Sequence, residues 1–134
     1  MKNQQINLIG ICLLFLVACT PNGEQYKHGQ LLYETHCESC HMKDGTGLGA
    51  NIPPLAASDY LKQRQEDIAC IIKNGLEDTI TVNSVLYSEK MPAIPQLTTF
   101  QMANIINFIN HSWGNDFGYV NIQTLQENLK KCPY

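Results

Sequence analysis

The chain has 134 residues, a length that allows one small domain together with targeting segments. Twelve acidic residues against nine basic ones give a formal net charge of −3 at pH 7, so a basic surface for nucleic acid is not expected. The sequence shows no internal repeat and no low-complexity tract, which again favours a single folded unit.

Residues 1–18 predict a signal peptide. Lys2 precedes an apolar run at residues 6–18, which is too short to span a bilayer. The run leads into Cys19 in a way that resembles the lipobox of bacterial lipoproteins, in which this cysteine is diacylated and the residues before it are removed. On this interpretation Cys19 is lipidated and anchors the chain stably. The alternative is an ordinary secretory signal cut nearby, with Cys19 lost or left free.

Residues 19–27 predict a lipidated, flexible tether, because they are polar and include one proline and one glycine. A tether of this length would keep the following domain close to the membrane surface. The folded domain is predicted at residues 28–114, and a C-terminal extension follows at residues 115–134.

The region from about residue 28 to residue 40 predicts a helix. It leads into a C-x-x-C-H motif made by Cys37, Cys40 and His41, which is the haem-attachment pattern of c-type cytochromes. One helical turn presents both sulfurs on one side, where they can form thioethers to two vinyl groups. The histidine that follows can then ligate the iron. A single motif predicts one covalently bound haem c.

Two other uses of a C-x-x-C pair are possible. A thioredoxin-like redox pair needs a βαβ pattern around the motif, and a zinc site needs a second close pair of ligands. Neither feature is visible in the sequence, because Cys70 and Cys132 stand alone and far from the motif. A coincidental motif in an ordinary exported domain is the remaining alternative.

After the motif, residues 42–49 are too rich in glycine for regular structure, and their glycines would let the backbone pass close to the edge of a flat cofactor. A short helical turn is predicted at residues 58–61 and a helix at residues 65–74, with Gly75 after its last turn. Two short β-branched runs then flank a two-residue turn at Asn83 and Ser84, and they predict a small hairpin at residues 79–87.

Met91 is followed directly by Pro92. The proline removes one backbone donor and holds the loop extended, which suits a side chain that must point into a pocket. Met102 competes for such a role, but it lies within a helical apolar stripe, where core packing explains it. Met42 is the neighbour of His41 and cannot reach the far side of a cofactor that His41 binds.

The last helix of the predicted domain has the clearest signal. Thr98 and Gln101 form a capping box at its start, and Gly114 is expected to stop it. One apolar face is made by Met102, Ile105, Ile106, Ile109 and Trp113. In the extension, a further short helix is indicated by Ile122, Leu125 and Leu129.

The helix, the haem motif and the Met-Pro pair together resemble class I monohaem cytochromes c over about residues 26–113. The resemblance implies an all-α cytochrome c fold, a small helical bundle around one haem, with the hairpin as a minor insertion. Gly29 and Tyr33 stand where this family places a small residue and an aromatic residue, so that its first and last helices can cross closely.

The same resemblance implies the ligands of the iron. Met91 would supply the sixth ligand, on the face opposite His41. In this family a proline carbonyl two residues before a leucine accepts the second N–H of the histidine, and Pro53 before Leu55 fits this pattern. His28, His36 and His111 are expected on solvated helix surfaces.

The remaining cysteines are Cys70 and Cys132, since Cys12 leaves with the signal and the others take lipid or haem. Two thiols in an oxidising compartment predict a disulfide that fastens the C-terminal tail. The alternative is a pair of buried free cysteines.

These features predict an electron carrier rather than an enzyme, lipid-anchored in a bacterial cell envelope with its domain facing the periplasm or the outside. His41 and Met91 would fill both axial positions, so no small-molecule substrate could reach the iron, and the partners would be redox proteins that donate and accept electrons. One alternative is the fixed haem subunit of a larger oxidoreductase. Another is a haem enzyme or sensor with an open distal site, although the sequence offers no obvious distal histidine–arginine pair.

Overall fold

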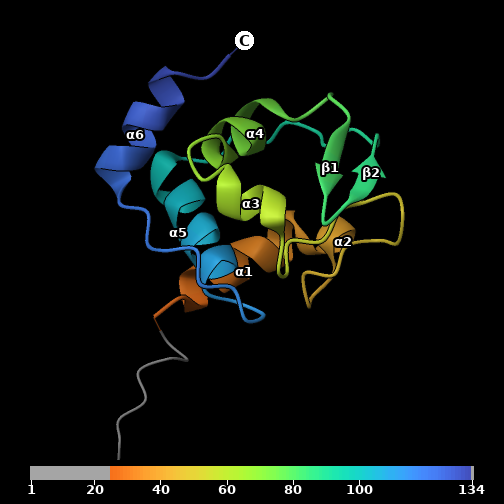
Figure 1. The fold of residues 1–134 in the computed structure, drawn as a ribbon. Coiled ribbons are helices and arrows are strands. Elements are labelled where there is room, and N and C mark those ends of the chain that lie inside the picture. Colours follow the sequence, from red (N-terminus) through yellow and green to blue (C-terminus); the bar gives the residue numbers. More distant parts are fainter. Residues whose placement is uncertain (1–24, 134) are drawn as a thin grey trace, which may run out of the picture.

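The computed structural model describes residues 25–133, and the predicted signal peptide and Cys19 lie outside this range. The described part of the chain is mostly helical with one small antiparallel sheet, as the sequence predicts (Figure 1). Within it, no helix combines the length and the apolar character needed to cross a membrane. The elements in chain order are α1 (Lys27–His36), α2 (Glu38–His41), α3 (Asp59–Gln63), α4 (Ile68–Asn74), β1 (Ile80–Val82), β2 (Val85–Tyr87), α5 (Thr99–Asn110) and α6 (Ile122–Lys130).

Helices α1 and α5 cross in direct contact, as the sequence predicts (Figure 1). Gly29 lies at the crossing, where an added Cβ would be 2.1 Å from the carbonyl oxygen of Asn104 and 2.8 Å from Cβ of Phe108. Tyr33 fills the space beside it and is only 1% exposed. Its hydroxyl donates a hydrogen bond of 2.6 Å to the carbonyl of Met42. The crossing therefore also fixes the residue that follows the haem motif.

The helix predicted over residues 28–40 is interrupted in the structure. Its first part is α1, which begins at Lys27, within the predicted tether, and its second part is the single turn α2. Cys37 separates the two parts with φ −124° and ψ −35°, outside the helical range. Its N–H still donates to the carbonyl of Tyr33, and its own carbonyl accepts from His41, so both parts stay hydrogen-bonded through this residue.

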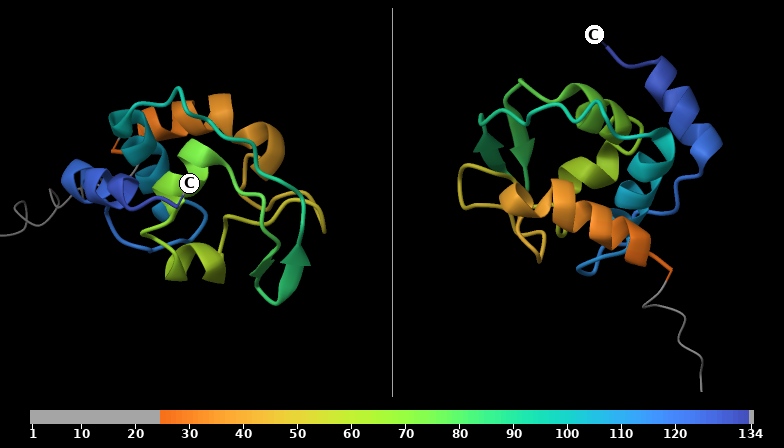
Figure 2. Two further views of the ribbon diagram at one scale, coloured as in Figure 1. Left: turned by 90° about the horizontal axis from the view of Figure 1, so that it is seen from above. Right: turned by 180° about the vertical axis from the view of Figure 1, so that it is seen from behind.

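The hairpin is present with the predicted two-residue turn. Strands β1 and β2 pair antiparallel, and Asn83 and Ser84 between them have φ of 49° and 67°. Positive φ at both turn residues is typical of the tight turn that matches strand twist. The backbone N–H of Asp59 donates to Oδ1 of Asn83 at 3.1 Å, and the backbone N–H of Asn83 donates to Oδ1 of Asp59 at 2.7 Å. The hairpin is thereby tied to the start of α3, and it lies on the side of the domain away from α6 in Figures 1 and 2.

Helix α4 begins at Ile68, three residues later than predicted, because Gln65 has a different use. Its side-chain amide donates to the carbonyl of Leu61 and exchanges hydrogen bonds with the side chain of Asn110 on α5. These contacts hold a turn between α3 and α4 that local helix propensity alone would not produce.

Helix α5 has the predicted capping box, with both reciprocal hydrogen bonds between Thr98 and Gln101 present. It ends at Asn110 rather than near Gly114. The carbonyl of Ile109 accepts from the backbone N–H of Ser112 and from the side chain of Asn115, so it is satisfied without a further helical turn. Trp113 then takes a left-handed conformation with φ 54°.

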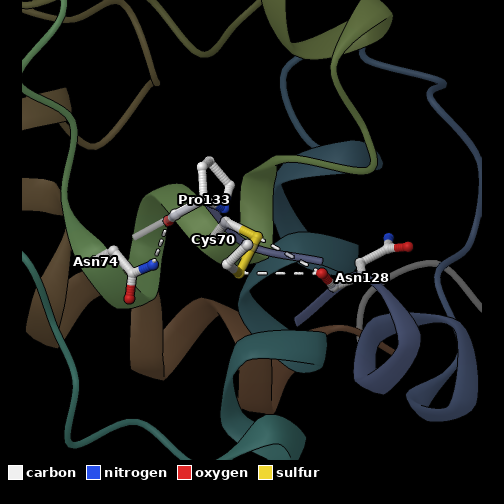
Figure 3. Close-up of a disulfide and its surroundings, with 5 residues drawn as sticks. Cys70, Asn74, Asn128 and Pro133 are labelled. Carbon is white, nitrogen blue, oxygen red and sulfur yellow. Dashed lines mark hydrogen bonds between the residues drawn. A yellow bond between two sulfur atoms is a disulfide. The ribbon is translucent and has the colours of Figure 1, made fainter. Parts of the chain in front are cut away.

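The C-terminal extension folds back onto the domain, with the short helix that the sequence predicts. Leu125 of α6 is buried in the core, and α6 packs against α4 and α5. The predicted disulfide between Cys70 and Cys132 is confirmed, with 5.4 Å between the two Cα atoms (Figure 3). Asn74 also donates a hydrogen bond of 3.5 Å to the carbonyl of Pro133. Closing so long a loop stabilises the fold by roughly 4 kcal/mol in the loop-entropy model.

We expect Gly29→Ala to destabilise the protein by about 1–3 kcal/mol, because the new methyl group overlaps a backbone carbonyl of α5 that cannot rotate away. The better helix propensity of alanine, worth up to about 1 kcal/mol, does not offset this overlap. Thermal unfolding measures the change. Leu31→Ala, at a half-exposed position of the same helix, serves as control and should change stability by less than about 0.5 kcal/mol. A Gly29→Ala protein as stable as the control would show that the helices do not meet this closely.

Candidate functional site

An apolar cavity of about 280 Å³, partly open to the surface, extends into the domain. Residues from α2, from the loop after it, from α4, from the hairpin and from the Met91 segment all contribute to its wall. Its apolar lining includes Ile52, Leu55, Leu61, Ile68, Ile72, Val82, Tyr87, Ile105 and Ile109. Such a wall suits a flat, largely hydrophobic ligand.

The three residues of the haem motif all line this cavity. Cys37 and His41 are placed one turn apart, since the N–H of His41 donates to the carbonyl of Cys37 at 2.9 Å. Cys37 is half-buried and Cys40 is exposed, and neither is in a disulfide. Before a haem is attached, burial, and to a smaller degree the neighbouring Cys40, raises the pKa of the Cys37 thiol to about 12.

His41 is buried, and its ring is held by the loop that follows. Nδ1 lies 3.2 Å from the carbonyl oxygen of Pro53. A carbonyl only accepts hydrogen bonds, so Nδ1 carries the proton and Nε2 keeps a free lone pair that can bind a metal ion. Burial lowers the pKa of His41, and the hydrogen bond to Pro53 only partly opposes this effect. The ring is thus neutral at pH 7, which is the form that ligates iron.

The carbonyl of Pro53 can lie at this position because Gly47, which it contacts, has no side chain. A Cβ on Gly47 would be 2.3 Å from the carbonyl oxygen of Ile52 and 2.6 Å from that of Pro53. The sequence predicts that the glycines of this loop let the backbone pass close to the edge of the cofactor. The structure shows a packing role for two of them, since Gly45 lies against the ring of Trp113 and Gly47 against Pro53.

Met91 lines the same cavity as the motif residues. Its backbone is fixed by two hydrogen bonds of 2.9 Å, exchanged with the N–H and carbonyl of Leu76. Gly75 makes this approach possible, because its φ is 81° and a Cβ there would be 2.7 Å from the carbonyl oxygen of Met91. Sequence reasoning gave Gly75 only the role of ending α4. A glycine that ends a helix leaves no separate signal for a second contact.

The competing side chains lie elsewhere. Met102 is buried in the core and does not line the cavity. Three histidines are also absent from the cavity wall: His28 is near the ring of Phe100, His111 stacks on Tyr26, and His36 is half-buried on α1. Over residues 25–133, no group of three or more histidine, cysteine or acidic side chains gathers as a metal-ion site.

The family model for cytochrome c matches residues 26–113 of this chain. The chain belongs to the cytochrome c family. Members of this family are electron-transfer proteins with covalently bound haem c and its iron, and this chain carries the same cofactor. The wall of the cavity fits that group, because it combines two free cysteine thiols, a neutral histidine with a free Nε2 and a methionine with an apolar lining.

The similar curated proteins are bacterial. The chain is 33% identical over 98 residues to the cytochrome c subunit of a quinone alcohol dehydrogenase from Gluconobacter oxydans, a match that covers 70% of this chain and 20% of that subunit. It is 29% identical over 83 residues to cytochrome c-552 of Thermus thermophilus, covering 59% of this chain and 63% of that protein. The chain thus spans less than two thirds of the length of either relative.

We expect Gly47→Ala to destabilise the protein more than Gly49→Ala. Both glycines have positive φ, so each substitution carries a backbone strain of about 1–2 kcal/mol. Only at residue 47 does the methyl group also overlap the carbonyls of Ile52 and Pro53, at a further cost of about 1–3 kcal/mol, whereas the space around Gly49 is open. Thermal unfolding gives the comparison, and equal losses would contradict this arrangement.

Proposed function

We propose that this chain is a monohaem electron carrier in which Cys37 and Cys40 hold the haem covalently and His41 and Met91 are the axial ligands. The observation that carries this proposal is that one apolar cavity is lined both by the motif and by Met91, which lies 50 residues after His41. When bound, haem iron supplies a one-electron couple between its ferric and ferrous states.

The residues of the site hold the two proposed ligands in fixed positions. His41 is oriented by the Pro53 carbonyl, and Met91 is held by backbone hydrogen bonds to Leu76. Ligands that keep their positions in both oxidation states reduce the reorganisation that accompanies electron transfer. The thioether of Met91 would favour the ferrous state and raise the reduction potential relative to two histidines. With both axial positions filled, small molecules are kept from the iron.

A redox partner would reach the site where the chain around it is exposed. Cys40, Pro92 and Ala93 are all exposed, and the first two line the cavity. Lys90 nearby forms an exposed ion pair of 3.2 Å with Glu77, so this surface is mixed in charge. We infer that electron donor and acceptor proteins bind transiently at this apolar rim.

A fixed haem subunit of a larger oxidoreductase is the second candidate. The observation in its favour is that one relative is named as the cytochrome c subunit of a dehydrogenase. Co-purification of a stable complex from membranes would distinguish it from a free carrier. A haem enzyme with an open distal side has less support, because Arg64, the chain's one arginine, pairs with Asp67 and does not line the cavity.

We expect Met91→Ala to keep the haem attached but to lower the reduction potential, because the thioether that favours the ferrous state is lost. Its dithionite-reduced absorption spectrum should shift when carbon monoxide is added, whereas that of the wild type should not. Met102→Leu is the matched control, since it changes a buried methionine outside the cavity wall and should leave both measurements unchanged.

An unchanged potential and a closed iron in Met91→Ala would assign the sixth ligand to another residue. A wild-type spectrum that already shifts with carbon monoxide would instead favour an open distal site, and peroxide turnover or gas binding would then be measured.

We also propose a location in the bacterial cell envelope, with the chain anchored through acylated Cys19. The support is the lipobox-like sequence that ends in this residue, followed by a polar stretch before the folded domain. Cys19→Ser should release the protein from the membrane fraction and remove the mass of the acyl chains, with the haem retained. Membrane association of Cys19→Ser equal to that of the wild type would contradict the anchor.

A further inference from the structure

Asn115 is a buried polar residue that sequence reasoning left without a role. Its side chain is 7% exposed and lies just after the end of α5. Its amide makes three hydrogen bonds: Nδ2 donates to the carbonyls of Leu55 at 3.0 Å and Ile109 at 2.9 Å, and Oδ1 accepts from the N–H of Ala57 at 2.8 Å. One side chain thus joins the end of α5 to a segment about 60 residues earlier in the chain.

The segment that Asn115 holds begins two residues after Pro53. The N–H groups of Leu55 and Ala56 both donate to the carbonyl of Gly45, at 2.7 and 2.9 Å. Four hydrogen bonds, two to Asn115 and two to Gly45, therefore fix this short stretch of backbone. The position of the Pro53 carbonyl depends on it, because only Pro54 separates the two.

The same turn after α5 also holds the other end of this loop. The ring of Trp113 covers Gly45, and its Nε1 donates a hydrogen bond of 3.1 Å to the carbonyl of Lys43, two residues after His41. Trp113 thus contacts the loop shortly after His41, and Asn115 contacts it shortly after Pro53.

Backbone strain accompanies both contacts. Ala57 and Trp113 have φ of 50° and 54°, in the left-handed region that residues with a side chain rarely adopt. Such conformations each cost on the order of 1–3 kcal/mol and persist only where surrounding contacts determine them. The contact of Asn115 with Ala57 holds the backbone of Ala57 in this conformation. The contacts of Trp113 with Lys43 and Gly45 do the same for Trp113.

We propose that Asn115 is a positioning residue for His41. By fixing the backbone at Leu55 and Ala57, it sets where the carbonyl of Pro53 lies, and with it the hydrogen bond from Nδ1 of His41. This role rests on the proposed function, since it requires His41 to ligate the iron. A stronger hydrogen bond makes the imidazole a more basic ligand, which favours the ferric state. Loss of Asn115 should therefore raise the reduction potential.

The test compares two variants of the haem-loaded protein, Asn115→Ala and the matched control Asn107→Ala. Asn107 is also buried, at 4% exposed, and also holds a distant backbone: it exchanges two hydrogen bonds of 2.8 Å with Val120. Its contacts reach the C-terminal extension and not the loop between His41 and Pro53. Both variants should melt at a lower temperature, because both lose buried hydrogen bonds.

Two further measurements separate positioning from mere stability. Only Asn115→Ala should raise the midpoint potential. By NMR, the Nδ1 proton of His41 should exchange with solvent roughly tenfold faster in Asn115→Ala than in the wild type, as expected for weakening of one hydrogen bond. In Asn107→Ala the potential and the exchange rate should match the wild type.

Equal potentials and equal Nδ1 exchange rates in the two variants would overturn this role of Asn115, with the proposed function intact. If Asn115→Ala does not fold, hydrogen exchange in the wild type decides instead. The Ala57 amide proton and the Nδ1 proton of His41 should then exchange with solvent through the same opening of the structure. Exchange through separate openings would overturn the positioning role of Asn115. A wild-type protein without a bond between His41 and iron would overturn the proposed function and this role together.

Discussion

The close crossing of α1 and α5 is the contact from which the site is built. It is possible only because Gly29 has no side chain where α5 passes. Helix α1 leads through Cys37 into α2, which carries Cys40 and His41, and α5 leads directly into the turn that holds Trp113. Tyr33 connects the two ends, since its ring packs against Trp113 and its hydroxyl bonds the residue after His41. The absence of a side chain at Gly29 thus allows the haem motif and the turn that supports it to lie together.

The cavity beside this crossing is closed by elements that have no sequence proximity to the motif. The hairpin contributes Val82 and Tyr87 to the wall, while Leu86 on its other face is 67% exposed. The alternation of a strand explains both facts. The hairpin is therefore a wall of the site and not only an insertion. The disulfide acts from a further distance, because it fastens the C-terminal extension to α4, whose Ile68 and Ile72 line the cavity.

The proposed ligands are both held by backbone rather than by neighbouring side chains. The carbonyl of Pro53 orients His41, and the N–H and carbonyl of Leu76 hold Met91. In each case a glycine with positive φ, Gly47 or Gly75, permits two backbone segments to approach. Backbone contacts of this kind leave few degrees of freedom, which is what a carrier needs if its site is to change little between oxidation states.

The sequence by itself determined the features that depend on near neighbours: the haem motif, the capping box of α5, the two-residue hairpin turn and the helix in the extension. These arise from fixed spacings that local hydrogen bonding enforces. Only the tertiary structure decided that the helix is interrupted at Cys37. It also decided which backbone groups form hydrogen bonds with Asn115, and which backbone segment lies against Gly47. Asn115 reaches partners 58 and 60 residues away. A buried amide must bond whatever backbone groups the fold brings to it, and such a requirement leaves no periodic pattern in the sequence.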